Sequence, residues 1–241
     1  MKPYYEHAGI TIYHGDCREI LPTLPKVDLV LTDPPWELND SQIEIRATGV
    51  APRRQKSLTI KQGCIGRFDA SVIKLLNEQS QHDCFFLCGY RELSDLIQAC
   101  PVLRGVWAWH KPNGAPAAFY PTKMDLSFIV WSGPKSLLYG HKHYPSMVFS
   151  HCFPAAGCFA SERFVDPSGK AEHPCQGPLE LYRALMMPFP VDSVILDAYC
   201  GTGTTLRAAK DLGRKAIGIE IEERYCEIAA NRLAQEVLSL T

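Results

Sequence analysis

The sequence predicts one α/β domain built around a mostly parallel sheet, and three observations lead to this fold class. The chain has 241 residues, which suits a single large domain. Apolar residues make up 46% and charged residues 21%, as in ordinary packed proteins, which argues against global disorder. Short apolar runs of strand type alternate with segments of helical periodicity, a pattern typical of doubly wound sheets.

Seven runs are expected to form strands, because each is short, apolar and bounded by turn-forming residues. They are residues 9–14, 27–32, 84–88, 102–109, 126–131, 194–197 and 215–221. Five segments are expected to form helices, on apolar spacing such as that of Leu93, Leu96 and Ile97. They are residues 70–77, 92–100, 178–187, 204–212 and 223–238. Residues 134–176 are rich in Gly, Pro, Ser and His without a clear period, which predicts an irregular insertion.

The charge pattern excludes a globally basic surface, because the formal net charge is −1. Two windows without acidic residues, 45–67 and 126–161, nevertheless concentrate Lys, Arg and His. A run of charge is more often a solvated face. Two such windows in a nearly neutral chain favour local binding of an anion such as nucleic acid.

Membrane and metal functions receive no support from the sequence. No apolar run approaches the roughly 18 residues of a membrane span, and the first residues lack the apolar core of a signal peptide. We therefore expect a cytoplasmic protein with its ten scattered cysteines reduced. A zinc site could in principle use residues 151, 152, 158, 173 and 175, but their spacing matches no pattern of paired ligands, so no metal is predicted.

A glycine-rich segment, Asp197–Thr205 (D-A-Y-C-G-T-G-T-T), lies between a predicted buried strand and a predicted helix. Gly201 and Gly203 allow a tight turn and a close approach of the backbone to a ligand. Glu220 ends the next strand, where a carboxylate can accept both hydroxyls of a nucleoside ribose. The alternative interpretation is a structural strand–turn–helix loop followed by an incidental glutamate.

A second motif, Asp33-Pro34-Pro35-Trp36, stands at the predicted carboxyl end of a strand, the edge at which open α/β sheets bind ligands. An aromatic amine is a poor nucleophile, because its lone pair is delocalised into the ring. The Asp33 carboxylate and the Pro34 carbonyl can both accept hydrogen bonds from such an amine and aim its lone pair at an electrophile. Trp36 offers a flat face on which a base can stack. The alternative is a simple Pro-Pro turn that ends a strand.

Together these motifs resemble the β-class amino methyltransferases of DNA, which methylate adenine N6 or cytosine N4. The resemblance implies a Rossmann-like, S-adenosylmethionine-dependent methyltransferase fold with a seven-stranded, mostly parallel sheet. It also implies a circularly permuted order, with the catalytic motif first and the glycine loop last, and this chain has that order. The resemblance covers nearly all of a single domain, 1–241. The exceptions are a basic loop at 37–66, which follows the catalytic motif, and an insertion at 134–172, where the class has its target-recognition region.

The resemblance assigns roles to individual residues. The catalytic set is Asp33, Pro34, Pro35 and Trp36. The residues expected to contact S-adenosylmethionine are Asp16, Asp33, His173, Pro178, Asp197, Tyr199, Gly201, Gly203, Thr204, Thr205, Glu220 and Ile221. Positive charge, rather than a family motif, selects the residues expected to bind DNA, which are Arg53, Arg54, Lys56, Lys111, Lys142 and His143. The sequence departs from the family where Gly177 replaces the usual Lys, Cys175 replaces Thr, and D-A-Y-C replaces D-P-F-x.

The expected activity is site-specific methylation of adenine N6 in DNA by direct transfer to a flipped base. Asp33 and Trp36 in the motif favour adenine, whereas cytosine-N4 enzymes more often carry Ser at the first position. The alternatives are a cytosine-N4 enzyme, an RNA adenine methyltransferase and a non-catalytic relative that binds DNA. The glycine loop favours the DNA branch over the RNA branch. DNA is the expected partner in a bacterial or phage-infected cell, and a homodimer and a companion restriction endonuclease are left open.

Overall fold

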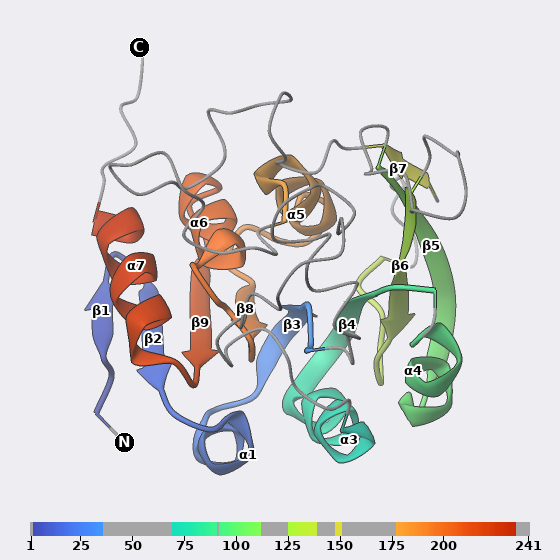
Figure 1. Cartoon of the computed structure of the whole chain (residues 1–241), viewed down its shortest axis with the longest axis horizontal. Coiled ribbons are helices and arrows are strands. Elements are labelled where there is room, and N and C mark those ends of the chain that lie inside the picture. The colour runs from blue at the N-terminus through green and yellow to red at the C-terminus, as the bar shows by residue number, and fades with distance from the viewer. Residues whose placement is uncertain are drawn as a thin grey trace, which may run out of the picture.

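The computed structural model describes residues 2–35, 69–90, 92–111, 125–138, 148–150 and 177–234. These residues form a nine-stranded sheet with helices on both faces (Figure 1). Five of the eight strand pairings are parallel, which confirms the predicted α/β class with a mostly parallel sheet. Within the described residues, no helix is long and apolar enough to cross a membrane.

The strands lie in the order β1-β2-β9-β8-β3-β4-β6-β5-β7. Their bounds are β1 (Tyr5–His7), β2 (Ile10–His14), β3 (Val27–Thr32), β4 (Ser80–Cys88), β5 (Leu103–Lys111), β6 (Asp125–Ser132), β7 (Val148–Ser150), β8 (Val194–Asp197) and β9 (Lys215–Glu220). The helices are α1 (Cys17–Ile20), η1 (Leu21–Thr23), α3 (Ala70–Gln79), α4 (Leu93–Ala99), α5 (Leu179–Met186), α6 (Thr204–Asp211) and α7 (Glu223–Ala234). All seven predicted strands and all five predicted helices are present, although residues 235–238 of the last helix lie outside the described residues.

The predicted strand count of seven was wrong, because one short strand extends the sheet at each edge. β1 folds back on β2 through Ala8 and Gly9, which both have positive φ, of 49° and 78°. β7 lies inside the segment predicted to be irregular and pairs in parallel with the edge of β5. A three-residue edge strand is held by backbone hydrogen bonds, so it needs no apolar pattern that sequence analysis could detect.

β4 begins at Ser80, four residues before the predicted start at Cys84. The prediction missed these four residues because they are polar and lack the apolar pattern of a buried strand. Asp83 is fully buried, and its carboxylate accepts hydrogen bonds from Trp131 Nε1 at 2.7 Å and from the Leu137 amide at 2.8 Å. A buried carboxylate with two donors is tolerated in a core strand. The polar start of β4 therefore links it to β6 and to the residues that follow β6.

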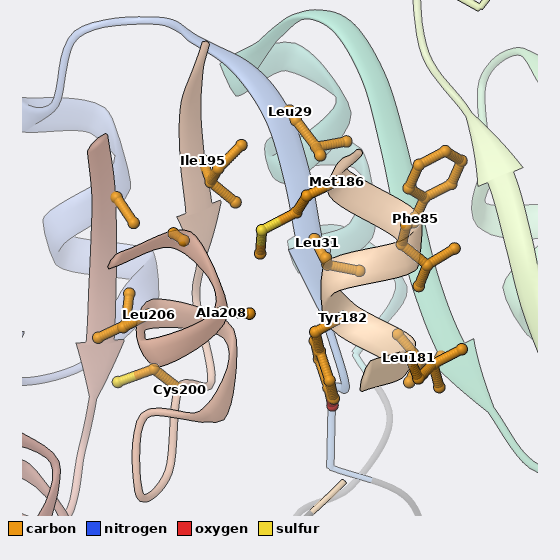
Figure 2. Close-up of a cluster of buried hydrophobic side chains, with 14 of the residues drawn as sticks. Leu29, Leu31, Phe85, Leu181, Tyr182, Met186, Ile195, Cys200, Leu206 and Ala208 are labelled. Atoms are coloured by element: carbon orange, nitrogen blue, oxygen red, sulfur yellow. The ribbon is translucent and has the colours of Figure 1, made fainter. Parts of the chain in front are cut away.

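The strands alternate their side chains between two apolar layers. Leu29, Leu31 and Phe85 face a cluster that α5, α6 and α7 cover, and Figure 2 shows part of it. Val30 and Phe86 face the opposite cluster, against α1, α3 and α4. This period of two places helices on both faces of a sheet that is buried in its centre.

The parallel strands β2, β9, β8, β3 and β4 all end at one edge of the sheet. From β8 the chain runs through α6 to β9 on one side, and from β3 it runs to β4 on the other. The boundary between β8 and β3 is therefore a topological switch point, the position at which open α/β sheets bind ligands. Asp33 and Asp197 follow or end these two strands.

Gly218 sets how closely α6 packs on β9. A Cβ atom at this position would lie 2.6 Å from Leu206 Cδ1 and 2.9 Å from Cys200 Sγ. We expect Gly218→Ala to lower the free energy of unfolding by about 1–3 kcal/mol through overpacking. The matched control is Gly105→Ala in β5, where the new atom would lie 3.4 Å from Trp131 Cε3. It should change stability by less than about 1 kcal/mol. Equal effects in chemical denaturation would contradict the packing argument.

Candidate active site

The glycine loop between β8 and α6 adopts a backbone that its two glycines permit. Gly201 has a φ of 50° and Gly203 a φ of 77°, values that residues with a side chain rarely adopt. The Gly203 amide donates to the Cys200 carbonyl at 2.7 Å, which closes a tight turn into α6. The loop therefore brings the amino end of α6, with its partial positive charge, to the ligand-binding edge of the sheet.

Arg232 of α7 supports this loop from inside the protein. Its residue surface is only 7% exposed, and Nη1 donates to the Thr202 carbonyl at 3.3 Å and to Thr204 Oγ1 at 3.0 Å. Sequence analysis missed this residue, because an arginine on an amphipathic helix is ordinarily expected on the solvent face. A helix distant in sequence thus fixes the position of the loop.

Glu220 connects the end of β9 to the glycine loop. Its two carboxylate oxygens accept hydrogen bonds from the amides of Gly201 and Glu222, each at 2.9 Å. Burial raises its pKa, and the two amide bonds oppose that shift. A carboxylate has about four acceptor positions, so two remain for a vicinal diol. This geometry fits the predicted role of Glu220 as a ribose acceptor.

Asp197 lies beneath the loop and joins it to the strand that carries the other motif. Its Oδ1 accepts hydrogen bonds from Thr32 Oγ1 at 2.7 Å and from the Tyr199 amide at 3.1 Å. Burial raises the pKa of Asp197 to about 6, while the bonds from Thr205, Thr32 and Tyr199 lower it and the nearby charge of Asp33 raises it. The two motifs are therefore close enough to influence each other electrostatically.

Asp33, Pro34 and Pro35 leave the carboxyl end of β3 beside the glycine loop. Asp33 is partly buried, and Pro34 is buried. The pKa of Cys88, at the end of β4, is raised first by burial and then by the charge of Asp33. Asp33 thus follows the carboxyl end of a strand, as predicted, and its charge also acts on residues at the ends of β4 and β8. Trp36 lies outside the described residues.

The next strand ends contribute Asp16 and Ile221. Asp16 caps α1 by accepting from the Arg18 amide at 2.8 Å, and its side chain also pairs with the Arg18 guanidinium, whose hydrogen bond lowers the pKa of the carboxyl. Ile221 follows Glu220 and is 60% exposed, so its apolar side chain is open at the edge of the sheet. The Gly15 amide donates to the Glu220 carbonyl at 2.9 Å, which joins the ends of β2 and β9.

Helix α5 brings two further residues to this edge, Pro178 as its N-cap and Tyr182, which sequence analysis did not select. Tyr182 is 4% exposed, and its pKa is raised well above the ordinary value by burial first and then by the charges of Asp33 and Asp197. The only sequence signal was the departure at Gly177, whose missing side chain leaves room for the Tyr182 ring.

The predicted site residues that remain are His173 and the cationic residues expected to bind DNA. His173, Arg53, Arg54, Lys56, Lys142 and His143 lie outside the described residues. Lys111 ends β5, which runs parallel to β4, so its backbone lies at the same edge of the sheet as Asp33. Among the described residues, no group of three His, Cys, Asp or Glu side chains could hold a metal ion.

Solved structures with this fold define its class. The M1.HpyAVI–SAM complex aligns with a TM-score of 0.64 at 23% identity, over 94% of this chain and 100% of that one. The PvuII DNA methyltransferase, described as cytosine-N4-specific, aligns with a TM-score of 0.66 at 17% identity, over 100% of this chain and 91% of that one. The chain therefore has the fold of the DNA methyltransferases that use S-adenosylmethionine.

Sequence comparisons find similar proteins among the DNA methyltransferases. Residues 131–231 match the N6/N4 family of DNA methylases. The type II methyltransferase M.ScaI of Streptomyces caespitosus is 27% identical over 99% of this chain and 86% of its own length. M.HinfI of Haemophilus influenzae, another type II methyltransferase, is 42% identical over 32% of this chain and 22% of its own length. The chain is therefore similar in sequence to the DNA N6/N4 amino methyltransferases, the family that its motifs resemble.

The bond between Thr32 and Asp197 gives a pH-dependent prediction. At pH 8 Asp197 is ionised, and Thr32→Val should lower the free energy of unfolding by about 2 kcal/mol, because a hydrogen bond to a charge is lost. At pH 5, below the pKa of about 6, the carboxyl is mostly protonated and the loss should fall to about 1 kcal/mol. Denaturant titrations at both pH values measure the difference, with Thr11→Val on β2 as the matched replacement. A loss that does not change with pH would contradict the prediction.

Proposed function

We propose that this protein is a site-specific DNA methyltransferase that transfers a methyl group from S-adenosylmethionine to the exocyclic N6 of adenine. The observation that carries the proposal is the meeting of Asp33 and the glycine loop at one switch point, linked by the 2.7 Å bond between Thr32 and Asp197. One motif presents acceptors for an amine, and the other presents a nucleoside-binding loop. Their adjacency suits transfer between two ligands bound side by side.

The residues at the edge fit the proposed cofactor. Gly201 and Gly203 leave the loop backbone open to close approach, and Glu220 keeps acceptor positions for a ribose. Asp33, Asp197 and Glu220 add negative charge, which favours a ligand that carries a positive sulfonium. S-adenosylmethionine, when bound, supplies an electrophilic methyl group. We propose that Asp16, Tyr199, Ile221 and the first turn of α6 complete the contacts.

Asp33 and Pro34 prepare the nucleophile in this proposal. Their carboxylate and carbonyl oxygens accept hydrogen bonds from the amino group of the flipped base, and so direct its lone pair toward the methyl carbon. Formation of the N–C bond would be matched by cleavage of the methyl–sulfur bond, with S-adenosylhomocysteine as the leaving group, while the amine loses one proton to Asp33 and then to solvent. No enzyme nucleophile is needed. Burial raises the pKa of Cys17 and Cys200, which keeps both thiols protonated and unreactive.

Adenine is proposed as the target because the motif carries Asp33 at its first position and Trp36 at its fourth. DNA contacts are proposed for the cationic residues of 37–66 and 134–172 and for Lys111, on the charge of these segments. A restriction-modification setting with a companion endonuclease is proposed because the two relatives named above are type II methyltransferases.

Nucleoside mass spectrometry tests the proposal. Unmethylated plasmid DNA and, in parallel, RNA are incubated with the protein and S-adenosylmethionine, then digested to nucleosides. We expect N6-methyladenine in DNA. N4-methylcytosine would keep the mechanism and replace the target base, and product in RNA alone would replace the substrate. No product from either nucleic acid would favour a non-catalytic, DNA-binding relative.

Asp33→Ala should abolish methylation while the affinity for S-adenosylmethionine changes by no more than a few-fold. The physical reason is that the carboxylate acts on the amine of the base, whereas Glu220 and the glycine loop hold the cofactor. Single-turnover methylation and isothermal titration calorimetry measure the two properties. Asp95→Ala, an exposed position on α4, is the control and should change neither. Retained turnover in Asp33→Ala would exclude the proposed role.

A further inference from the structure

We propose that His14 positions the carboxylate of Glu220, so that the site distinguishes a ribose from a 2′-deoxyribose. The link between the two residues is the peptide group that joins Ile221 to Glu222. This role rests on the proposed binding of S-adenosylmethionine, in which Glu220 accepts the ribose hydroxyls. His14 is then a positioning residue, which acts on the cofactor through other residues and belongs to neither of the two motifs.

His14 holds a backbone carbonyl that lies just beyond the sheet. β2 lies between β1 and β9 (Figure 1), and its parallel register with β9 ends at the pair His14 and Glu220. The carbonyl of Ile221 therefore comes after the last paired residue. His14 Nε2 lies 3.1 Å from this oxygen, and the imidazole is the donor because a carbonyl only accepts. The side chain thus extends the contact between the two strand ends by one hydrogen bond.

The peptide group after Ile221 carries this contact to the Glu220 carboxylate. The Ile221 carbonyl and the Glu222 amide belong to the same planar group. Its oxygen accepts from His14, and its N–H donates to Glu220 Oε1 at 2.9 Å. In a trans peptide these two bonds point in opposite directions, so the plane is held from both sides. Fixing the carbonyl therefore fixes the amide that Glu220 binds.

The Glu222 amide determines the orientation of the Glu220 carboxylate. Oε1 accepts from this amide, and Oε2 accepts from the Gly201 amide, also at 2.9 Å. Each oxygen thus has one fixed donor and a further acceptor position, which is the arrangement that two adjacent hydroxyls need. Burial raises the pKa of the Glu220 carboxyl, and the Glu222 amide is the donor that most opposes this rise. Without that amide, the carboxylate can turn away from one of the hydroxyls.

An aromatic contact holds the imidazole in place. The rings of Tyr4 and His14 meet edge to face, with their centroids 6.2 Å apart and an interplanar angle of 72°. Tyr4 is itself attached to β2, because its amide donates to the Ile12 carbonyl at 2.8 Å. The hydrogen bond from His14 to Ile221 is exposed, so water competes for the carbonyl. A ring that is already oriented loses less entropy when it makes this bond.

The test compares S-adenosylhomocysteine with its 2′-deoxyribose analogue by isothermal titration calorimetry. The wild-type protein should prefer S-adenosylhomocysteine by about tenfold or more, because the analogue leaves a carboxylate acceptor unpaired. His14→Ala should reduce this preference to less than about threefold, since the exposed bond is lost. His14→Gln should keep most of it, because its amide nitrogen can still donate to the Ile221 carbonyl.

His7→Ala is the matched control and should keep the full preference. His7 is also an exposed histidine beside a tyrosine, with its ring centroid 6.5 Å from that of Tyr5. It lies on β1, in the same hairpin as His14. A thermal melt of each variant checks that the fold is retained.

Unchanged discrimination in His14→Ala would overturn the proposal, as would equal weakening of both ligands, which a purely structural role would produce. The proposal also fails if His14→Gln loses as much as His14→Ala, or if His7→Ala loses the preference. If wild-type protein binds both ligands equally, Glu220 is not a ribose acceptor and the role of His14 fails, while cofactor binding stands. If it binds neither ligand, the proposed function itself fails, together with the role of His14.

Discussion

The hydrogen bond from Thr32 to Asp197 is the interaction on which the site depends. It joins residues 165 positions apart in the chain and lies between the central strands β3 and β8. On one side of it Asp33 leaves β3, and on the other the glycine loop leaves β8. A shift between these strands would separate the two motifs, because strand register moves in steps of a whole residue. Burial of both partners, at 0% and 3% exposure, fixes that register.

The central part of the fold could be predicted from sequence, because buried parallel strands are continuous apolar runs and Gly, Asp and Pro mark their ends. The same pattern placed Asp33, Asp197 and Glu220 at one edge. The remaining features depend on tertiary contacts. β1 and β7 are held by backbone pairing, the first half of β4 contains the buried Asp83, and Arg232 is buried only because the loop offers it acceptors.

Negative charge is concentrated at the candidate site. Three carboxylates are gathered at the ends of β3, β8 and β9, and burial raises the pKa of two of them, Asp197 and Glu220. Such a cluster is unfavourable without a compensating charge, so it favours cationic ligands at the cost of stability in the ligand-free protein. Amide donors from Gly201, Tyr199 and Glu222 offset part of that cost. The same arrangement therefore accounts for the tight backbone geometry around the three carboxylates.

The support that Arg232 gives to the glycine loop has a consequence for biosynthesis. Ribosomes make the chain from its amino end, so β3 and Asp33 emerge long before the loop, and the loop emerges before α7. Until α7 docks, the Thr202 carbonyl and the Thr204 hydroxyl lack the guanidinium that holds them. β2 likewise lacks its neighbour β9 until that strand has been synthesised, about 200 residues after β2. The nascent chain thus completes the support of its glycine loop only after α7 has emerged, well after β3 and Asp33 have been made.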